Sequence, residues 1–385
     1  MDFRETTEQA ALRAAVAELG AKYGNTYTLA KARAHEAPRE LWAEAGKLGF
    51  LGANLPAAYG GGGAGLFELA LVEEELSAAG CGLLMMVVSP AICGTVITRF
   101  GSDEQRRRYL PALASGEQIM AFAITEPDAG SNSHRITTTA RRDGDGWRLT
   151  GRKIYISGVD QADHVLVVGR TEDARTGRLK PALFVVPTDA PGLQYTPIEM
   201  DVVMPDRQFL LFLDDVRLPR EALVGDEDAA LAQLFAGLNP ERVMAAALSL
   251  GTARYALDRA ARYAGERSVW GTPIGAHQGL AHPLAQVKIE LELARLMMQK
   301  AAVLYDGGDD LGAGEAANMA KYAAAEVAVR AVDQAVQTFG GNGLASEYGL
   351  GSLLATARVG RIAPVSREMI LNFVAQFSLN LPKSY

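Results

Sequence analysis

Apolar residues recur at helical spacing through the first third of the chain, up to about residue 118. Two groups of them follow the three- and four-residue steps that line one face of a helix: Ala11, Ala15 and Leu19, and then Leu69, Val72 and Leu76. Thr6 and Gln9 have the spacing of a capping box, which would start the first helix. We therefore expect residues 1–118 to form an N-terminal, all-helical domain.

The pattern changes between residues 119 and 225. Four short runs of β-branched, aromatic and other apolar residues, at 147–150, 164–168, 182–186 and 208–213, are separated by Gly, Pro and Asp. Runs of this length and composition are typical of strands. Residues 119–225 are therefore predicted to form a middle β domain.

Helical spacing returns at residue 226 and continues to residue 385. One face of a long helix is marked by a set of apolar residues: Leu284, Val287, Leu291, Ala294 and Met298. A C-terminal helical bundle is expected here. The order helix, sheet, helix has no alternating βαβ rhythm, so it predicts an α+β fold rather than a doubly wound sheet.

The composition indicates a folded protein with sizeable cores, since the chain has 385 residues and 49% of them are hydrophobic. The formal net charge is -7 and the sequence pI is near 5.4, which argues against nucleic-acid binding. No stripe of Lys or Arg appears beyond short clusters such as Arg106-Arg107-Arg108, which is interpreted as a solvated helix face.

The chain lacks the features of a membrane or secreted protein. Its start has neither the basic nor the apolar region of a signal peptide, and no uncharged apolar run reaches the roughly 20 residues that span a bilayer. Cys81 and Cys93 lie in apolar surroundings without a CxxC pair, as buried thiols in a reducing compartment do. The five histidines lack metal-ligand spacing. We expect a cytoplasmic protein with no membrane partner and no metal site.

The segment from Gly60 to Gly65 matches the GxGxxG pattern of dinucleotide-binding folds. A functional match needs a preceding strand and an acidic residue about 20 residues later, and the sequence provides neither. The segment is therefore interpreted as a flexible loop before a helix.

Two segments carry the most specific chemistry: Ala-Ile-Thr-Glu-Pro-Asp-Ala-Gly-Ser at 123–131 and Lys-Ile-Tyr-Ile-Ser-Gly at 153–158. A hydroxyl after an apolar run, small turn residues, and an aromatic and a hydroxyl at the end of a second strand would suit a flat heteroaromatic cofactor such as a flavin. Pro, Asp and Gly in succession are also ordinary turn residues, so a simple turn between two strands is the alternative interpretation.

Together the two segments resemble the first signature of the acyl-CoA dehydrogenase family, usually Thr-Glu-Pro-x-Ala-Gly-Ser-Asp and then Lys-x-Trp-Ile-Thr-Asn-Gly. The resemblance continues in the family's order at residues 266–274, 277–278 and 337–343. It implies an FAD-dependent enzyme that oxidises a saturated acyl thioester to the enoyl product and passes electrons to an electron-transfer flavoprotein. It also implies that the middle domain is a small β-barrel or sandwich and that the C-terminal domain, 226–385, is a four-helix bundle.

The resemblance implies a cofactor site made from two sets of residues. The first set surrounds the flavin ring and comprises Phe122, Ile124, Thr125, Gly130, Ser131, Tyr155 and Ser157, with Ser366 and Glu368 from near the carboxy end. The second set binds the adenine and pyrophosphate half and comprises Arg267, Trp270, Ile274, His277, Gln278, Gln337, Gly340 and Gly341. In the family the second set comes from a neighbouring subunit, which implies a homotetramer built as a dimer of dimers.

The catalytic base is expected at the less common of two family positions. Most members carry a glutamate in a Tyr-Glu-Gly-Thr segment near the carboxy end, and Pro364 occupies that slot here. The isovaleryl-CoA and long-chain enzymes carry the base on another helix, where Glu241 aligns. Asn239 and Pro240 fit the N-cap and first position of a helix, so Glu241 would lie in its first turn. A surface role for Glu241, with Glu368 as the rival carboxylate, is the alternative.

Pro364 also affects the expected polarisation of the thioester carbonyl, because the family uses the backbone N–H at this slot and proline has none. Either the N–H of Val365 replaces it, or the chemistry is unusual, with desaturation at another position or a thioester other than coenzyme A. The resemblance implies that Ser131, Arg242 and Ala363 contact the substrate, carried on coenzyme A or on an acyl carrier protein. A same-fold oxidase that uses oxygen, or a catalytically silent flavoprotein, are the alternative functions.

Overall fold

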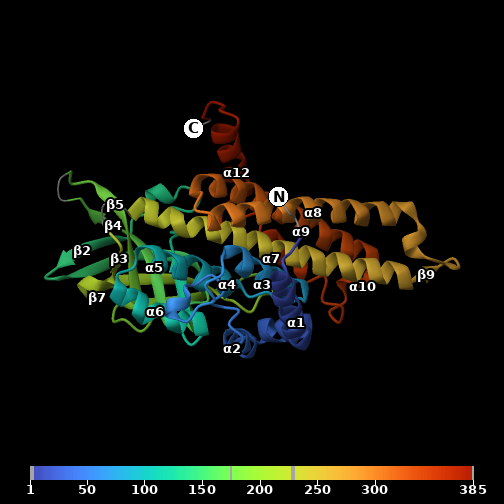
Figure 1. Cartoon of the computed structure of the whole chain (residues 1–385), viewed down its shortest axis with the longest axis horizontal. Helices are drawn as coiled ribbons and strands as arrows, with labels where there is room; N and C mark the ends of the chain where they lie inside the picture. Colours follow the sequence, from blue (N-terminus) through green and yellow to red (C-terminus); the bar gives the residue numbers. More distant parts are fainter. Residues whose placement is uncertain (1–3, 174–175, 227–229, 384–385) are drawn as a thin grey trace.

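The computed structural model describes residues 4–173, 176–226 and 230–383 (Figure 1). The N-terminal part is helical, as expected. Its elements are α1 (Thr7–Ala34), α2 (Arg39–Lys47), η1 (Ala57–Tyr59), α3 (Leu66–Ala78), α4 (Leu84–Met86), the π-helical η2 (Val87–Gly94), α5 (Thr95–Phe100) and α6 (Asp103–Ser115).

Helix α1 begins at the predicted capping box. The Gln9 N–H donates to Thr6 Oγ1 over 3.2 Å, and the Thr6 N–H donates to Gln9 Oε1 over 3.0 Å. Two of the four N–H groups that a helix start leaves unpaired thus find partners, and the prediction is confirmed.

The buried face of α1 differs from the predicted one. Val16 and Leu19 are buried, whereas Ala11 and Ala15 are exposed. Alanine has little apolar surface to hide, so the larger Val16 determines which face turns to the core. In α3, the predicted face is correct, and its three apolar residues are buried.

Within the described residues of the middle part, eight strands form a sheet: β1 (Met120–Ala123), β2 (Thr139–Asp143), β3 (Gly146–Ser157), β4 (His164–Glu172), β5 (Leu179–Pro187), β6 (Leu193–Ile198), β7 (Gln208–Leu218) and β8 (Leu223–Val224). Their order is β6-β7-β3-β2-β4-β5-β8, and β1 pairs in parallel with β4. The four predicted runs lie in β3, β4, β5 and β7. Trp147 of β3 packs edge-to-face against Phe184 of β5 inside the core.

Three long helices dominate the C-terminal part: α7 (Ala230–Glu266), α8 (Gln278–Asp306) and α9 (Asp310–Phe339). Shorter helices follow, namely α10 (Gly341–Leu344), α11 (Leu353–Val359), α12 (Arg367–Phe373) and the π-helical η7 (Val374–Ser378). The hairpin of β9 (Ser268–Val269) and β10 (Thr272–Pro273) joins α7 to α8. The predicted apolar face of α8 is buried. The observed order of helical, β and helical parts matches the predicted α+β fold.

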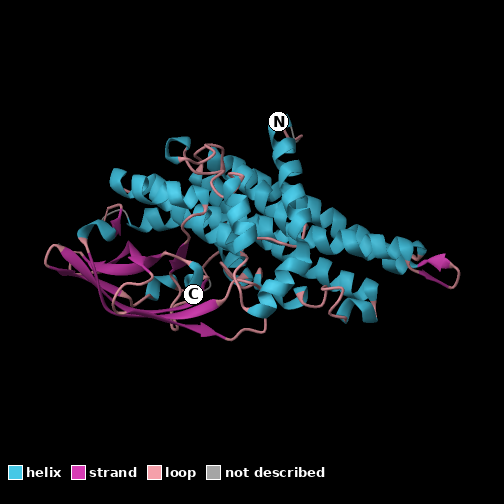
Figure 2. Ribbon diagram, turned by 90° about the horizontal axis from the view of Figure 1, so that it is seen from below, coloured by secondary structure: helices cyan, strands magenta, loops and turns pink. Residues whose placement is uncertain are grey.

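The sheet lies at one end of the molecule and the long helices extend away from it to the β9 hairpin (Figure 2). Helix α7 packs against α3, α8, α9 and η2, so it connects the N-terminal helices to the C-terminal ones. One continuous hydrophobic core runs through all three parts. In the described portion of the chain, no helix combines the length and apolar character needed to cross a membrane.

The glycine-rich loop at Gly60–Gly65 is not a nucleotide site. No strand lies between residue 4, where the described chain begins, and this loop, and Gly65 is the N-cap of α3. The first N–H groups of α3, from Leu66 and Phe67, donate to the carboxylate of Asp306 over 2.8 and 3.0 Å. The groups that would bind a phosphate are therefore occupied by a side chain of this protein, and the interpretation as a loop before a helix is confirmed.

Both cysteines are buried and free, as expected. Burial raises the pKa of the Cys81 thiol to about 12 and raises that of the Cys93 thiol strongly. Neither thiol is a reactive nucleophile at neutral pH. Among the described residues, no cluster of three or more His, Cys, Asp or Glu side chains could hold a metal ion.

Candidate active site

A buried ion pair joins the two signature segments. Lys153 Nζ, in β3, lies 2.9 Å from Glu126 Oε1, just after β1, and donates to the Ile124 carbonyl over 2.9 Å. Glu126 also accepts from the backbone N–H groups of Thr137 and Thr138. The two charged side chains are 0% and 4% exposed. The loop that follows β1 is thus fixed against β3.

Both members of this pair are ionised at neutral pH. Burial lowers the pKa of Lys153 to about 8, against the opposing effect of Glu126. Burial alone would raise the pKa of Glu126, but hydrogen bonding from the Thr137–Thr138 segment and the charge of Lys153 outweigh it and lower that pKa to about 2. The pair therefore holds the loop after β1 in place and does not donate or accept a proton in the reaction.

Tyr155 presents an aromatic ring to solvent beside the ion pair. A β-bulge between Lys153 and Ile156 gives Tyr155 a φ of 58°, which is uncommon for an aromatic residue. Its side chain is 56% exposed. Two residues later, Ser157 and the Gln208 side chain hydrogen-bond each other. The bulge therefore turns the Tyr155 ring outward, while the Ser157 hydroxyl stays on the sheet.

The other members of the first set that belong to the signature segments lie in β1 or in the loop after it. Phe122 is buried, Ile124 and Thr125 are partly exposed, and Gly130 and Ser131 are exposed. A Cβ added at Gly130 would meet no atom within 4 Å, so the space in front of this loop is open. An aromatic face, hydroxyl donors and open space fit a flat ring with a polar edge such as the isoalloxazine of FAD.

The second set lies at the far tip of the helical bundle. Trp270 and Gly271 are the central residues of the β9–β10 turn, with φ of 52° and 80°, the values that a two-residue hairpin turn requires. Trp270 is 91% exposed. The other exposed members are Arg267, His277, Gln278, Gln337, Gly340 and Gly341, while Ile274 is partly buried. An exposed guanidinium beside an aromatic and open glycines fits the phosphates and adenine of a dinucleotide.

The structure does not bring the two sets together within one chain. Tyr155 lies on β3 at one end of the long axis, and Arg267 precedes β9 at the other end (Figure 1). One cofactor could contact both only if a second chain supplied one of them.

The predicted helix start at Asn239 and Pro240 is wrong. Both residues lie inside α7, which begins at Ala230, so Glu241 is not in a first turn and no helix-terminal dipole acts on it. The proline is tolerated because Tyr305 Oη donates to the Ala236 carbonyl, the group that an N–H at position 240 would otherwise satisfy.

The Glu241 side chain is partly exposed in the single chain, and desolvation by the surrounding protein, not a helix dipole, determines its proton affinity. Desolvation raises its pKa to about 7, although the nearby charges of Arg242 and Lys321 act to lower it. The Arg242 guanidinium donates to the Leu238 carbonyl over 3.1 Å, so it stays against its own helix. Perturbed carboxyl groups of this kind are typical of acid–base sites.

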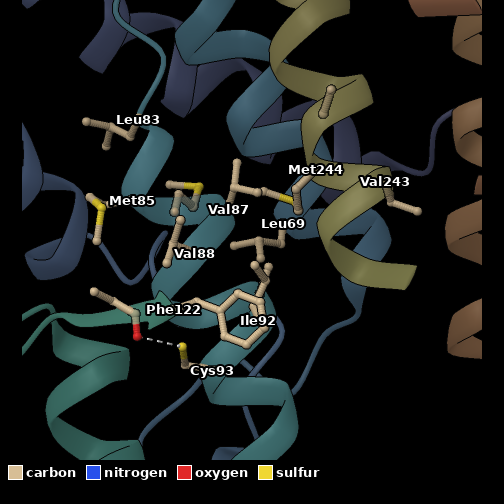
Figure 3. Packing of buried hydrophobic residues seen from close by; sticks show 14 of the residues in the cluster. Leu69, Leu83, Met85, Val87, Val88, Ile92, Cys93, Phe122, Val243 and Met244 are labelled. Carbon is tan, nitrogen blue, oxygen red and sulfur yellow. Dashed lines mark hydrogen bonds between the residues drawn. The ribbon is translucent and has the colours of Figure 1, made fainter. Parts of the chain in front are cut away.

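The wall beside this part of α7 is apolar. Met244 of α7 points toward Val87 of η2, and Ile92 of η2 and Phe122 of β1 lie next to each other in the same buried cluster (Figure 3). The thiol of Cys93 in η2 interacts electrostatically with Glu241 and donates to the Ala121 carbonyl of β1. Helix α7 and strand β1 therefore meet across η2, which brings Glu241 near the strand that leads into the first set.

The carboxy-terminal site residues lie on a short connection before α12. Ser366 is the N-cap of that helix and accepts from the Met369 N–H, and Ala363 is exposed. Glu368 is 68% exposed and pairs with Arg367 over 3.1 Å. The rival carboxylate is thus solvated and paired, whereas Glu241 is the one with a raised pKa.

Sequence reasoning does not identify two buried lysines of the site. Lys153 belongs to a signature segment, but its partner Glu126 follows only from the fold. Lys321 in α9 is 1% exposed. The available signal was a lone cation among the alanines of residues 313–325, at a spacing that faces the core.

Three sequence models of one family match consecutive parts of the chain. "Acyl-CoA dehydrogenase, N-terminal domain" matches residues 6–117, "Acyl-CoA dehydrogenase, middle domain" matches residues 121–216, and "Acyl-CoA dehydrogenase, C-terminal domain" matches residues 231–379.

Whole-chain similarity extends to characterised relatives. Acyl-CoA dehydrogenase FadE12 of Mycobacterium tuberculosis is 69% identical over 383 residues, covering 100% of this chain and 99% of that protein. The solved complex of glutaryl-coenzyme A dehydrogenase with glutaryl-CoA has a TM-score of 0.94 and 30% identity, covering 100% of this chain and 98% of that one. A glutaryl-CoA dehydrogenase from Mycobacterium smegmatis in complex with FADH2 has a TM-score of 0.90 and 27% identity, with coverage of 99% and 96%. The chain therefore belongs to the acyl-CoA dehydrogenase family and is a flavin-dependent acyl-CoA dehydrogenase whose cofactor is FAD.

Proposed function

We propose that Glu241 is the base that removes the α-proton of an acyl thioester while bound FAD accepts the β-hydride. The observation that carries this assignment is the position of Glu241 inside α7, where that helix packs against η2 and where desolvation raises the pKa of the carboxyl to about 7. A carboxylate with this proton affinity is a stronger base than an exposed one and is still largely ionised at slightly alkaline pH. Glu368, exposed and paired with Arg367, has a lowered pKa and is the weaker base.

The substrate proposed is an acyl-CoA rather than an acyl-carrier-protein thioester. The relatives described above are named as enzymes of CoA thioesters, and one of them, FadE12, is 69% identical over the whole of this chain. Ser131, Arg242 and Ala363 are proposed to contact the substrate. A panel of acyl-CoA and acyl-carrier-protein thioesters tests this choice, because only acyl groups attached to the true carrier should reduce the flavin rapidly.

The backbone near Pro364 is proposed to polarise the thioester carbonyl in a different way from most relatives. Pro364 offers no N–H, and the carbonyl of Val365 accepts a hydrogen bond from Lys321. The group that this residue can offer a ligand is therefore its N–H. If this donor is less well placed than the usual one, turnover of common acyl-CoAs should be slower, since a lost oxyanion donor costs about 100- to 1000-fold.

We propose that each FAD is shared between two chains of a homodimer, within a dimer of dimers. The first set holds the flavin ring in one chain, and Arg267, Trp270 and the glycines of the partner hold the rest. The opposite placement of the two sets within one chain supports this arrangement (Figure 1). Four apolar residues of α8 that face solvent in the single chain, Ile289, Leu293, Leu296 and Val303, are 62%, 63%, 44% and 58% exposed, as subunit contacts would be.

An electron-transfer flavoprotein is proposed to reoxidise the enzyme. Reduced enzyme should transfer electrons to such a protein and react slowly with oxygen. Rapid formation of peroxide without an added acceptor would instead identify an oxidase.

The base assignment is tested by anaerobic reduction of the bound flavin, followed as bleaching in a stopped-flow instrument. Glu241→Gln should reduce the rate at least about 100-fold, the scale on which general acid–base groups contribute, while FAD content stays unchanged. Glu18→Gln, at an exposed position of α1, is the matched control and should behave as the parent enzyme. Near-normal bleaching of the Glu241→Gln enzyme would overturn the assignment.

A further inference from the structure

Lys321 of α9 carries a buried charge that acts electrostatically on Glu241 and donates a hydrogen bond to the segment after Pro364. Its side chain is 1% exposed, and Nζ donates to the Val365 carbonyl. A buried ammonium is costly unless it is paired, so its retention needs an explanation beyond packing. The hydrogen bond links α9 to the connection that lies where most relatives carry the base.

The packing of α7 on α9 directs Lys321 toward Glu241. Gly314 lies seven residues before Lys321, on the same face of α9, and a Cβ there would be 3.3 Å from Asn239 Oδ1. Asn239 also donates to the Asp310 carbonyl over 3.0 Å. This face of α9 therefore meets α7 two residues before Glu241. Because helical side chains lean toward the N-terminus, Lys321 leans back toward that level.

The charged and titratable groups that face Glu241 in the described structure are few. They are Arg242 on α7, Lys321 on α9 and the Cys93 thiol on η2. Glu368 on α12 acts on Lys321. The guanidinium of Arg242 is bonded to the Leu238 carbonyl of its own helix, so Lys321 is the cation that a second helix supplies.

The proton affinity of Lys321 is compatible with a lasting positive charge. Burial lowers its pKa to about 8, and the charge of Glu241 opposes that effect. At pH 7 the ammonium is therefore mostly protonated while Glu241 titrates. The two groups form an acid–base pair whose members affect each other's ionisation.

We propose that Lys321 is a positioning residue for the proton-abstraction step, which keeps a cation facing Glu241 and fixes the Val365 backbone beside it. This inference depends on the proposed role of Glu241 as the base. The ammonium stabilises the carboxylate that accepts the proton, and its hydrogen bond holds the segment that must replace the N–H missing at Pro364. No bond to Lys321 forms or breaks in the reaction.

The test is the pH profile of anaerobic flavin reduction by an acyl-CoA in four holoenzymes: the parent, Lys321→Met, Lys321→Gln and Lys321→Arg. Methionine fills the space without charge or donor, glutamine keeps a donor without charge, and arginine keeps both. Removing the cation should move the midpoint of the profile upward by about one pH unit. The rate at pH 7 should then fall about fivefold in the Met and Gln enzymes and recover toward pH 9.

The rate on the alkaline plateau separates the two parts of the proposal. We expect it to be lower for Lys321→Met than for Lys321→Gln, since only the glutamine can bond the Val365 carbonyl. Lys321→Arg should keep the parent midpoint. Unshifted profiles in both uncharged variants, with FAD content intact, would leave only a structural role for Lys321 and overturn the proposal. If one uncharged variant fails to fold, the other gives the midpoint.

Failure of this inference is distinguishable from failure of the proposed function. Rapid bleaching of the Glu241→Gln enzyme would remove the base assignment whatever the lysine variants do. Slow bleaching of that enzyme, together with unshifted lysine variants, would retain the base and reject only the role of Lys321.

Discussion

The Tyr305 hydroxyl on α8 donates a hydrogen bond of 3.3 Å to the backbone carbonyl of Ala236 on α7. In an uninterrupted helix that carbonyl would accept from the N–H four residues later, but Pro240 has none. Tyr305 thus supplies the missing donor next to Glu241. A long helix can therefore run through the proline, and the carboxyl group stays on a continuous, packed element.

Replacing Tyr305 with phenylalanine should destabilise the protein by about 1 kcal/mol, because a partly buried carbonyl loses its donor. Urea unfolding of the holoenzyme measures the effect. The loss should shrink in a Pro240→Ala background, where the alanine N–H can bond the Ala236 carbonyl. An equal loss in both backgrounds would mean that Tyr305 acts through its other contact, the hydrogen bond from Arg99.

Lys153→Met should destabilise the protein more than the change at Tyr305, since it leaves the Glu126 carboxylate buried without its cation. Breaking one side of a buried pair costs about 3–5 kcal/mol, and the loop that is proposed to border the flavin should loosen with it. Both thermal stability and the FAD content of purified protein should fall.

The matched control is the double variant Glu126→Gln, Lys153→Met, which removes both charges. It should regain part of the stability that the single change loses. If it is no more stable than Lys153→Met alone, the charge pair is not what fixes the loop.

The sequence predicts the order of helical and β parts well because apolar residues recur at a different spacing in each part. Helical spacing and short β-rich runs depend on which face is buried, and burial dominates folding. The buried face of α1 was misplaced because Ala11 and Ala15 are small enough to lie in solvent. The core there is formed by Val16, whose position only the packing of α1 on α3 determines.

The helix start predicted next to Glu241 is wrong because it was based on local sequence alone, whereas the structure there depends on a contact with a residue far along the chain. Asn before Pro is a frequent helix start, and nothing nearby in the sequence reveals that Tyr305, 65 positions after Pro240, can replace the lost N–H. The same limit hid the link between Lys321 and Val365, which lie on different elements. Motifs indicate which residue types a site contains, but the tertiary fold decides which of them meet.

Asp206 should make the protein less stable as the pH rises. It is 6% exposed, and burial raises its pKa to about 6, although Gln161 donates to it over 2.9 Å. The folded state therefore binds this proton more tightly than the unfolded state. That contribution to stability is complete below the unfolded pKa and is lost as the pH rises through about 6.

Asp206→Asn should remove this dependence, since an amide keeps an oxygen for Gln161 and carries no charge. We expect the variant to be more stable than the parent at pH 7.5, by on the order of 2 kcal/mol, and similar to it near pH 4. Melting temperatures across that range measure the difference. Asp201→Asn, at an exposed position of the same connection, is the control and should follow the parent at every pH. If the melting temperature of Asp206→Asn differed from that of the parent by the same amount at every pH, titration of Asp206 would not be the cause of the pH dependence.

Sharing of FAD between chains can be tested with two inactive variants expressed together. Glu241→Gln should damage the proposed acid–base half of a site, and Arg267→Glu should damage the half proposed to hold the pyrophosphate. If the two halves come from different chains, a mixed dimer contains one site with both defects and one site with neither. Random pairing should then restore about a quarter of the parent activity.

If both halves of a site instead came from one chain, every site in a mixed dimer would carry one defect, and co-expression would restore nothing. In a dimer of dimers, purification over both tags removes only the tetramers that contain a single variant, so the recovered activity should rise slightly, to about two sevenths of the parent value. The placement of β3 and β9 at opposite ends of the single chain favours recovery (Figure 1). An inactive doubly tagged enzyme with normal FAD content would exclude the shared arrangement.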